Sequence, residues 1–134
     1  MSMNAANATS ATNVILRQGV VAAQNREFDR ARALLEQVTL ETPDDVIAWY
    51  WLAIASPSAD SAIPCLRRVL AIDDEHAPAR EALSLLLISE ARSAAAAGNR
   101  AGTRSLINEA TDLTPDLAAP WQAMAELAPA SLTV

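Results

Sequence analysis

A short motif that occurs twice constrains the fold of this chain more than any other feature. Thr42-Pro43-Asp44 is followed by Trp49, and Thr114-Pro115-Asp116 is followed by Trp121. The prolines are residues 43 and 115, so the copies lie 72 residues apart. This distance is about twice the period of ~34 residues found in helix-turn-helix repeats. The period predicts a third turn midway, where Asp73-Asp74-Glu75 stand without proline or tryptophan. The sequence therefore predicts a stack of helix pairs.

The segments between these turns have the sequence patterns of helices. The chain has 30 alanines and 16 leucines among 134 residues, and both residue types lose little conformational freedom on entering a helix. Apolar residues recur at helical spacing, as at Leu34, Leu35 and Val38. Thr42 is expected to cap a helix that begins at Pro43. The predicted helices lie near 13–24, 27–40, 44–55, 59–72, 76–97, 100–112 and 116–127.

The ends of the chain lack this helical pattern. Residues 1–12 are small and polar, which predicts a disordered N-terminal tail, and 128–134 form a second predicted tail. One helical domain is expected over 13–127. Pro64 and Pro120 fall inside predicted helices, where a proline removes a hydrogen bond, so each predicts a late helix start or a kink.

The spacing of large and small residues resembles that of the tetratricopeptide repeat (TPR) family, in its small bacterial three-repeat type. Small residues at the expected positions let neighbouring helices approach closely. The matching positions are Ile15, Gly19, Ala31, Leu35, Val38 and Pro43 in the first repeat, Trp49, Leu52, Ala53, Ala62, Leu66 and Val69 in the second, and Gly98, Ile107, Ala110 and Pro115 in the third. The resemblance implies an all-α, right-handed antiparallel helix-pair stack of about three repeats, with residues 118–127 as a C-terminal cap helix.

The resemblance also implies where a partner binds, because the first helices of stacked TPR repeats line a concave face. The positions assigned to this face are Leu16, Arg17, Val20, Tyr50, Trp51, Ile54, Leu85, Ile88 and Arg92. The best-known TPR clamp grips a terminal carboxylate with lysine and asparagine, whereas this chain has no lysine and carries apolar or aromatic side chains at the matching positions. We therefore expect an apolar groove that binds an apolar or amphipathic segment of another protein.

Several of these residues have a plain structural interpretation. Trp49 and Trp121 occupy the packing position of the family and are expected in the core. Tyr50 and Trp51 follow Trp49 directly, so the three rings cannot all face the same way on a helix, and at least one should be exposed or lie in the groove. Arg92 is either a ligand contact or a solvated or paired arginine.

The sequence predicts neither catalysis nor a bound metal or cofactor. The single histidine, His76, has no second histidine or cysteine at ligand spacing, and no glycine-rich phosphate loop occurs. The single cysteine, Cys65, lies in an apolar helical stretch and is interpreted as a buried hydrophobic residue in a reduced compartment. No signal peptide and no apolar run of ~18 residues is present, which predicts a cytoplasmic protein.

Charge and composition narrow the class of partner. The formal net charge is -6, with 16 acidic residues against 10 arginines, and this disfavours nucleic acid and anionic membranes. The prediction is a protein-binding adaptor. The alternatives are a self-association module that forms homo-oligomers and a dedicated secretion-type chaperone. The alanine excess and the absence of lysine predict a bacterial source.

Overall fold

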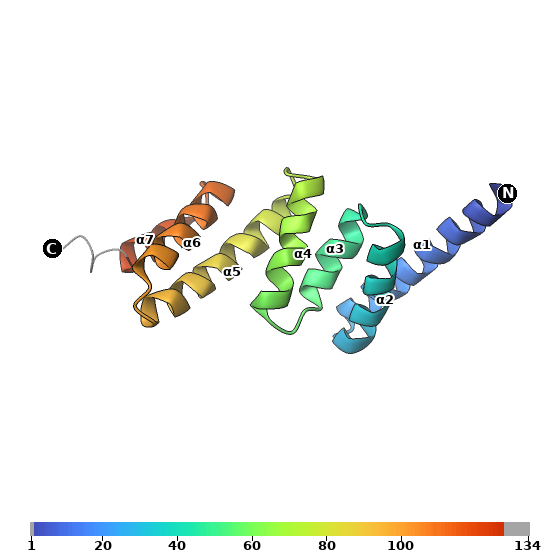
Figure 1. Ribbon diagram of the computed structural model, residues 1–134, viewed down its shortest axis with the longest axis horizontal. Coiled ribbons are helices and arrows are strands. Elements are labelled where there is room, and N and C mark those ends of the chain that lie inside the picture. Colours follow the sequence, from blue (N-terminus) through green and yellow to red (C-terminus); the bar gives the residue numbers. More distant parts are fainter. Residues whose placement is uncertain (1, 128–134) are drawn as a thin grey trace. The chain divides into compact units, whose positions relative to one another are not determined.

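The computed structural model describes residues 2–127, and these residues form helices joined by turns, without a strand (Figure 1). The all-α fold class is thereby confirmed. The helices are α1 (Ser2–Gln24), α2 (Phe28–Glu41), α3 (Val46–Ile54), α4 (Ala59–Ile72), α5 (Ala77–Ala96), α6 (Arg100–Leu113) and α7 (Ala118–Leu127). They divide into two compact units, Met1–Asp74 with α1 to α4 and Glu75–Val134 with α5 to α7, and each unit is described by itself.

In the first unit, α1 packs on α2, α3 packs on α4, and α3 also contacts both α1 and α2. Its fully buried side chains include Leu35, Val38 and Leu66. Gly19 on α1 confirms the expected close approach of helices, because a Cβ atom there would lie 2.8 Å from Cδ2 of Leu35. Small residues therefore set the helix spacing, and leucines fill the space between the helices.

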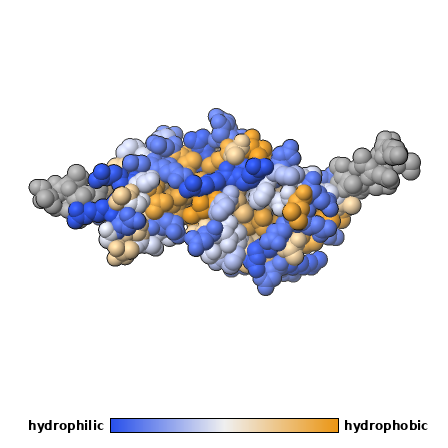
Figure 2. All heavy atoms as spheres, in the orientation of Figure 1, coloured by the Kyte–Doolittle hydropathy of each residue, from blue (hydrophilic) through white to orange (hydrophobic). Residues whose placement is uncertain are grey.

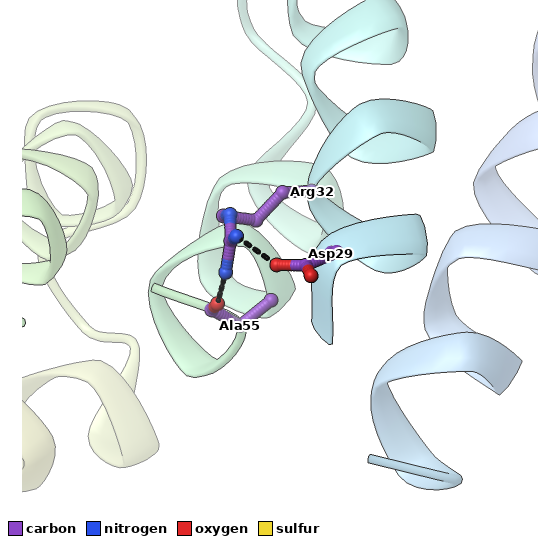
Figure 3. Close-up of polar contacts among 3 residues, drawn as sticks. All are labelled: Asp29, Arg32 and Ala55. Atoms are coloured by element: carbon purple, nitrogen blue, oxygen red, sulfur yellow. Dashed lines mark hydrogen bonds and ion pairs between the residues drawn. The ribbon is translucent and has the colours of Figure 1, made fainter. Parts of the chain in front are cut away.

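A polar contact links α2 to the end of α3 (Figure 3). The Arg32 guanidinium donates a hydrogen bond of 2.9 Å to the carbonyl oxygen of Ala55, which follows the last residue of α3. The same side chain forms an ion pair with Asp29, one turn earlier on α2. An arginine on one helix thus satisfies a carbonyl at the C-terminal end of another.

The second unit has a separate set of buried side chains. α5 packs on α6, and α7 contacts both of these helices. Leu83 and Leu87 of α5 are fully buried. The Ser84 hydroxyl lies 2.8 Å from the hydroxyl of Thr114 and 3.2 Å from the carbonyl oxygen of Ala110. These bonds satisfy a polar group inside the α5–α6 contact.

The turn after the first helix has the same geometry in each unit. The Glu27 amide donates to the carbonyl of Ala22 at 2.8 Å, and the Asn99 amide donates to that of Ala94 at 2.9 Å. Each bond spans five residues, the pattern of a Schellman helix end. The residue before each amide has a positive φ, +62° at Arg26 and +79° at Gly98.

The two Thr-Pro-Asp motifs also form matching turns. The hydroxyl of Thr42 donates to a carbonyl four residues earlier at 2.9 Å, and that of Thr114 does so at 3.1 Å. The indole N–H of Trp49 donates to the carbonyl of Pro43 at 2.7 Å. The Trp121 indole donates to the carbonyl of Pro115 at 2.9 Å. The 72-residue repetition in sequence is therefore a repetition of local structure.

Two expectations about helix starts are wrong. Thr42 does not cap the following helix: it ends α2, and Asp45 caps α3 by accepting a hydrogen bond of 3.1 Å from the amide of Ala48. Helix α1 begins at Ser2 rather than near residue 13. Thr12, inside the predicted tail, is buried and donates a 2.5 Å hydrogen bond to Glu41 of α2. No glycine or proline interrupts the helix before Thr12.

The two helical prolines differ. Pro64 is the sixth residue of α4, which begins at Ala59, so the late start expected there does not occur. The side chain of Pro64 is exposed, as is that of Asp60, four residues earlier, whose carbonyl loses its amide partner. Helix α7 begins at Ala118, so Pro120 lies in the first turn, where a missing amide hydrogen removes no helical bond.

Candidate partner-binding surface

Helix α3 is apolar on every side, although one side faces outward. Ala48, Leu52 and Ala55, at helical spacing, are buried within the first unit. The large side chains on the outward side are Ile47, Tyr50, Trp51 and Ile54. Ile47 is 54% exposed and Ile54 is 41% exposed, while the two aromatic residues between them are partly exposed. Apolar side chains that gather on an exposed helix face are a common sign of a protein-binding surface.

The two aromatic side chains at the centre of this stripe pack on each other. The rings of Tyr50 and Trp51 lie 5.8 Å apart, centre to centre, at an angle of 84°. This edge-to-face arrangement restrains both side chains before any partner binds. A pair of restrained aromatic rings between two exposed isoleucines has the composition of an interface centre.

Helix α1, which contacts α3, carries the other predicted partner-binding residues of this unit. Leu16 and Val20 lie one turn apart on α1 and are partly exposed, and Arg17 beside them is exposed. We call this surface the α1–α3 face. Its residues are Leu16, Arg17, Val20, Ile47, Tyr50, Trp51 and Ile54. Apolar side chains do reach the molecular surface, as the orange areas in the space-filling view illustrate (Figure 2).

The remaining three predicted residues belong to the second unit, on α5. Leu85 is exposed, and Arg92 forms an exposed ion pair of 3.3 Å with Glu126 of α7. Ile88 is only 4% exposed, so its prediction as a partner contact is wrong. Helix α5 has 20 residues, and over this length Ile88 joins Leu87 on the buried side of the helix. The candidate surface formed by α1 and α3 therefore lies within the first unit.

The first unit also contains a pocket that the sequence did not predict. This pocket of about 260 Å³ is lined by Arg17, Gln18, Val21, Ala22, Asn25, Glu27 and Arg30. Glu27 and Arg30 form an exposed ion pair of 3.3 Å at its edge. The pocket depends on the α1–α2 turn, so no spacing along one helix could have indicated it.

The histidine, cysteine and carboxylate side chains of the described residues form no cluster that could hold a metal ion. No group of three metal-ligating side chains comes together within residues 2–127. Cys65 of α4 is buried, and burial raises the pKa of its thiol, as does the nearby Glu36 carboxylate, while a hydrogen bond from Ser56 opposes the shift. A thiol in this environment is a poor nucleophile at neutral pH.

A search against protein-family models and a search of curated proteins found no match to this chain. Among the helices of residues 2–127, none has the length and apolar character needed to cross a membrane. The functional conclusion therefore depends on the chemistry of the exposed surface.

Proposed function

We propose that this chain is a non-catalytic adaptor of the TPR type that binds an apolar or amphipathic helix of another protein on the α1–α3 face. The observation that carries the proposal is the exposed stripe of α3 from Ile47 to Ile54, which contains no charged side chain. An amphipathic helix is the ligand that such a surface accommodates best, because its own apolar stripe has the same spacing.

The energetics of the face support this assignment. Burying one large aliphatic side chain completely is worth about 1.5–3 kcal/mol. Ile47 and Ile54 each have roughly half of their surface left to bury. Tyr50 and Trp51 lie between them, restrained by their mutual packing, so they lose little further freedom when a partner binds. Arg17, exposed at the edge, favours an acidic residue beside the apolar stripe of the partner.

Local structure supports the TPR assignment. Two turns 72 residues apart share the same threonine and tryptophan hydrogen bonds. Gly19 and Ala53, both at small-residue positions of the TPR pattern, are buried. A helix pair with close-approach sites and a capped turn is the unit from which such repeats are built.

Capture of partners by three forms of the full chain tests the proposal. The forms are the wild type, the double variant Ile47→Asp/Ile54→Asp and the control Leu40→Asp, each immobilised and exposed to extract from cells that naturally express the protein. Leu40 is 83% exposed on α2, outside the face, so its variant carries a similar apolar-to-acidic change. Circular dichroism should show the same helix content in all three, because every substituted side chain is exposed.

We expect one set of proteins to be captured by the wild type and by Leu40→Asp, and to be lost with the double variant. Two buried aspartates in an apolar interface should weaken binding by at least about a hundredfold. Equal capture by all three forms would show that binding, if any, occurs elsewhere. Loss with Leu40→Asp as well would equally contradict the proposal.

A further inference from the structure

Helix α7 occupies the same place after its turn that α3 occupies after the turn 72 residues earlier. Trp121 corresponds to Trp49, and each indole donates to the proline carbonyl of its own Thr-Pro-Asp motif. Continuing this alignment pairs Met124 with Leu52, Ala125 with Ala53 and Leu127 with Ala55. A neighbouring helix that packs on the tryptophan side would therefore meet corresponding residues on α3 and on α7.

In the first unit, α4 is that neighbour. The guanidinium of Arg68 on α4 lies 5.9 Å from the centre of the Trp49 ring, and it donates to the carbonyl of Pro43 at 3.4 Å. That carbonyl accepts from the Trp49 indole as well, so both of its lone pairs are used. Leu52 and Ala53 of α3, and Ala55 directly after it, are all buried.

In the second unit, the matching positions are uncovered. Trp121 is 50% exposed, and Ala125 is exposed where its counterpart in α3 is buried. Met124 and Leu127 are partly exposed where theirs are buried. Within residues 2–127, α7 is the last helix, so the described part of the second unit contains no counterpart of α4. The carbonyl of Pro115 accepts from the Trp121 indole and has a second lone pair for another donor.

We propose that the Trp121 side of α7 binds an amphipathic helix of a partner protein in the way that α4 binds α3. The partner helix should resemble α4 in three respects: a small residue on its contacting side, as the buried Ala62 is on α4, aliphatic residues in the same stripe, and an arginine placed over the Trp121 ring. That arginine also donates to the carbonyl of Pro115. This surface lies in the second unit and is independent of the α1–α3 face.

A peptide with the sequence of residues 57–74, which contains α4, is the probe because it carries all three features. Fluorescence anisotropy of the labelled peptide is measured against the full chain. The variant Ala125→Arg places a long side chain where the partner helix must approach. The matched control is Gln122→Arg, which adds the same charge at an exposed position. The residue of α3 that corresponds to Gln122 is Tyr50, which stays partly exposed although α4 packs on α3.

The peptide should bind the wild type and Gln122→Arg alike, and Ala125→Arg should weaken binding at least about tenfold. A peptide with Arg68→Ala should bind the wild type more weakly, because the contacts over Trp121 and with Pro115 are lost. Ile47→Asp/Ile54→Asp should leave peptide binding unchanged, which separates this surface from the α1–α3 face.

Three results would overturn the proposal. No binding at peptide concentrations up to ~1 mM, where a contact of about 4 kcal/mol is still detected, would show that the α7 side does not accept such a helix. Equal binding to the wild type and Ala125→Arg would mean that the peptide binds elsewhere. One such place is α3, if the peptide displaces the α4 helix of the chain itself. Equal weakening by Gln122→Arg and Ala125→Arg would show that added positive charge, rather than contact with α7, reduces the affinity.

Discussion

At the scale of single residues, the two matching turns show how the same backbone is reached with different side chains. Gly98 takes its positive φ without a steric penalty, and a Cβ atom there would meet open space. Arg26 takes nearly the same angle with a Cβ atom present, which costs about 1 kcal/mol. The Schellman hydrogen bonds of the turn hold Arg26 in that conformation.

Arg26→Gly should therefore stabilise the protein, by about 0.5–1 kcal/mol, because it removes the strain. Gly98→Ala should destabilise it by a similar amount, since the backbone penalty is introduced without any clash. Urea denaturation followed by circular dichroism measures both changes. A loss of stability in Arg26→Gly would mean that contacts of the arginine side chain outweigh the strain.

Cys65 predicts a dependence of stability on pH. Burial and Glu36 raise the pKa of this thiol above the value of about 9 that it has when unfolded. The stability linked to the thiol is therefore complete below about pH 9 and is lost as the pH rises toward the folded-state pKa. Between about pH 9 and the folded-state pKa, the free energy of unfolding should fall by up to ~1.4 kcal/mol per pH unit. Denaturation of Cys65→Ala over the same range should show a flatter dependence, and an unchanged slope would contradict the assignment.

At the scale of helices, arginines connect neighbouring elements by donating to exposed carbonyl ends. Arg32 of α2 donates to Ala55 at the end of α3, and Arg80 of α5 donates to the carbonyl of Leu113, the last residue of α6, at 2.9 Å. Arg68 of α4 donates into the turn before α3. The planar guanidinium offers five donors, so one side chain can serve a carbonyl and a carboxylate together. This is a structural use for the arginines of a chain without lysine.

Arg32→Met tests this kind of link, because methionine keeps the apolar stem and removes the donors. We expect a loss of about 1–2 kcal/mol, since the carbonyl of Ala55 loses its charged partner. Asp29→Ala should have almost no effect, because that carboxylate is 96% exposed and its ion pair is screened by water. Thermal unfolding of the two variants shows whether the hydrogen bond to Ala55 or the ion pair with Asp29 stabilises the protein. A larger loss in Asp29→Ala would show that the ion pair, rather than the helix-end bond, matters.

At the scale of the whole molecule, two units with separate buried cores present two different apolar surfaces. The α1–α3 face is aromatic at its centre, with Tyr50 and Trp51 in contact. The α7 side presents Trp121 beside the exposed Ala125. Because the surfaces differ in shape and chemistry, we expect them to bind different partner helices. The net charge of -6 opposes close approach of two copies of the chain.

The protein should therefore sediment as a monomer of 14.2 kDa over a wide range of concentration at physiological salt. This outcome separates the adaptor from the self-association module, which predicts a mass that rises with concentration. Analytical ultracentrifugation provides the measurement. If the mass does rise, and Ile47→Asp/Ile54→Asp restores the monomer, the α1–α3 face is a contact between copies and the adaptor proposal is wrong.

Much of the helical organisation could be predicted from local sequence patterns. The repeated Thr-Pro-Asp motif located two turns, and apolar spacing located the bodies of the helices, because helix formation depends on neighbours three and four residues apart. Helix ends were less predictable. Thr42 ends α2 instead of starting α3, since its hydroxyl can bond a carbonyl behind it as well as an amide ahead. Thr12 is buried and its hydrogen-bond partner, Glu41, lies 29 residues away, a pairing that local patterns do not reveal.

The sequence by itself determined the all-α class, the 72-residue repetition and the apolar character of α3, because these follow from residue type and short-range spacing. Only the tertiary structure decided which apolar residues stay exposed. Ile88 is buried and Ile54 is not, although both are isoleucines at predicted binding positions. Trp49 lies beneath Arg68 of α4, while Trp121 in the same motif is half exposed. Exposure depends on whether another helix packs on a given side, and that contact joins residues far apart in the chain.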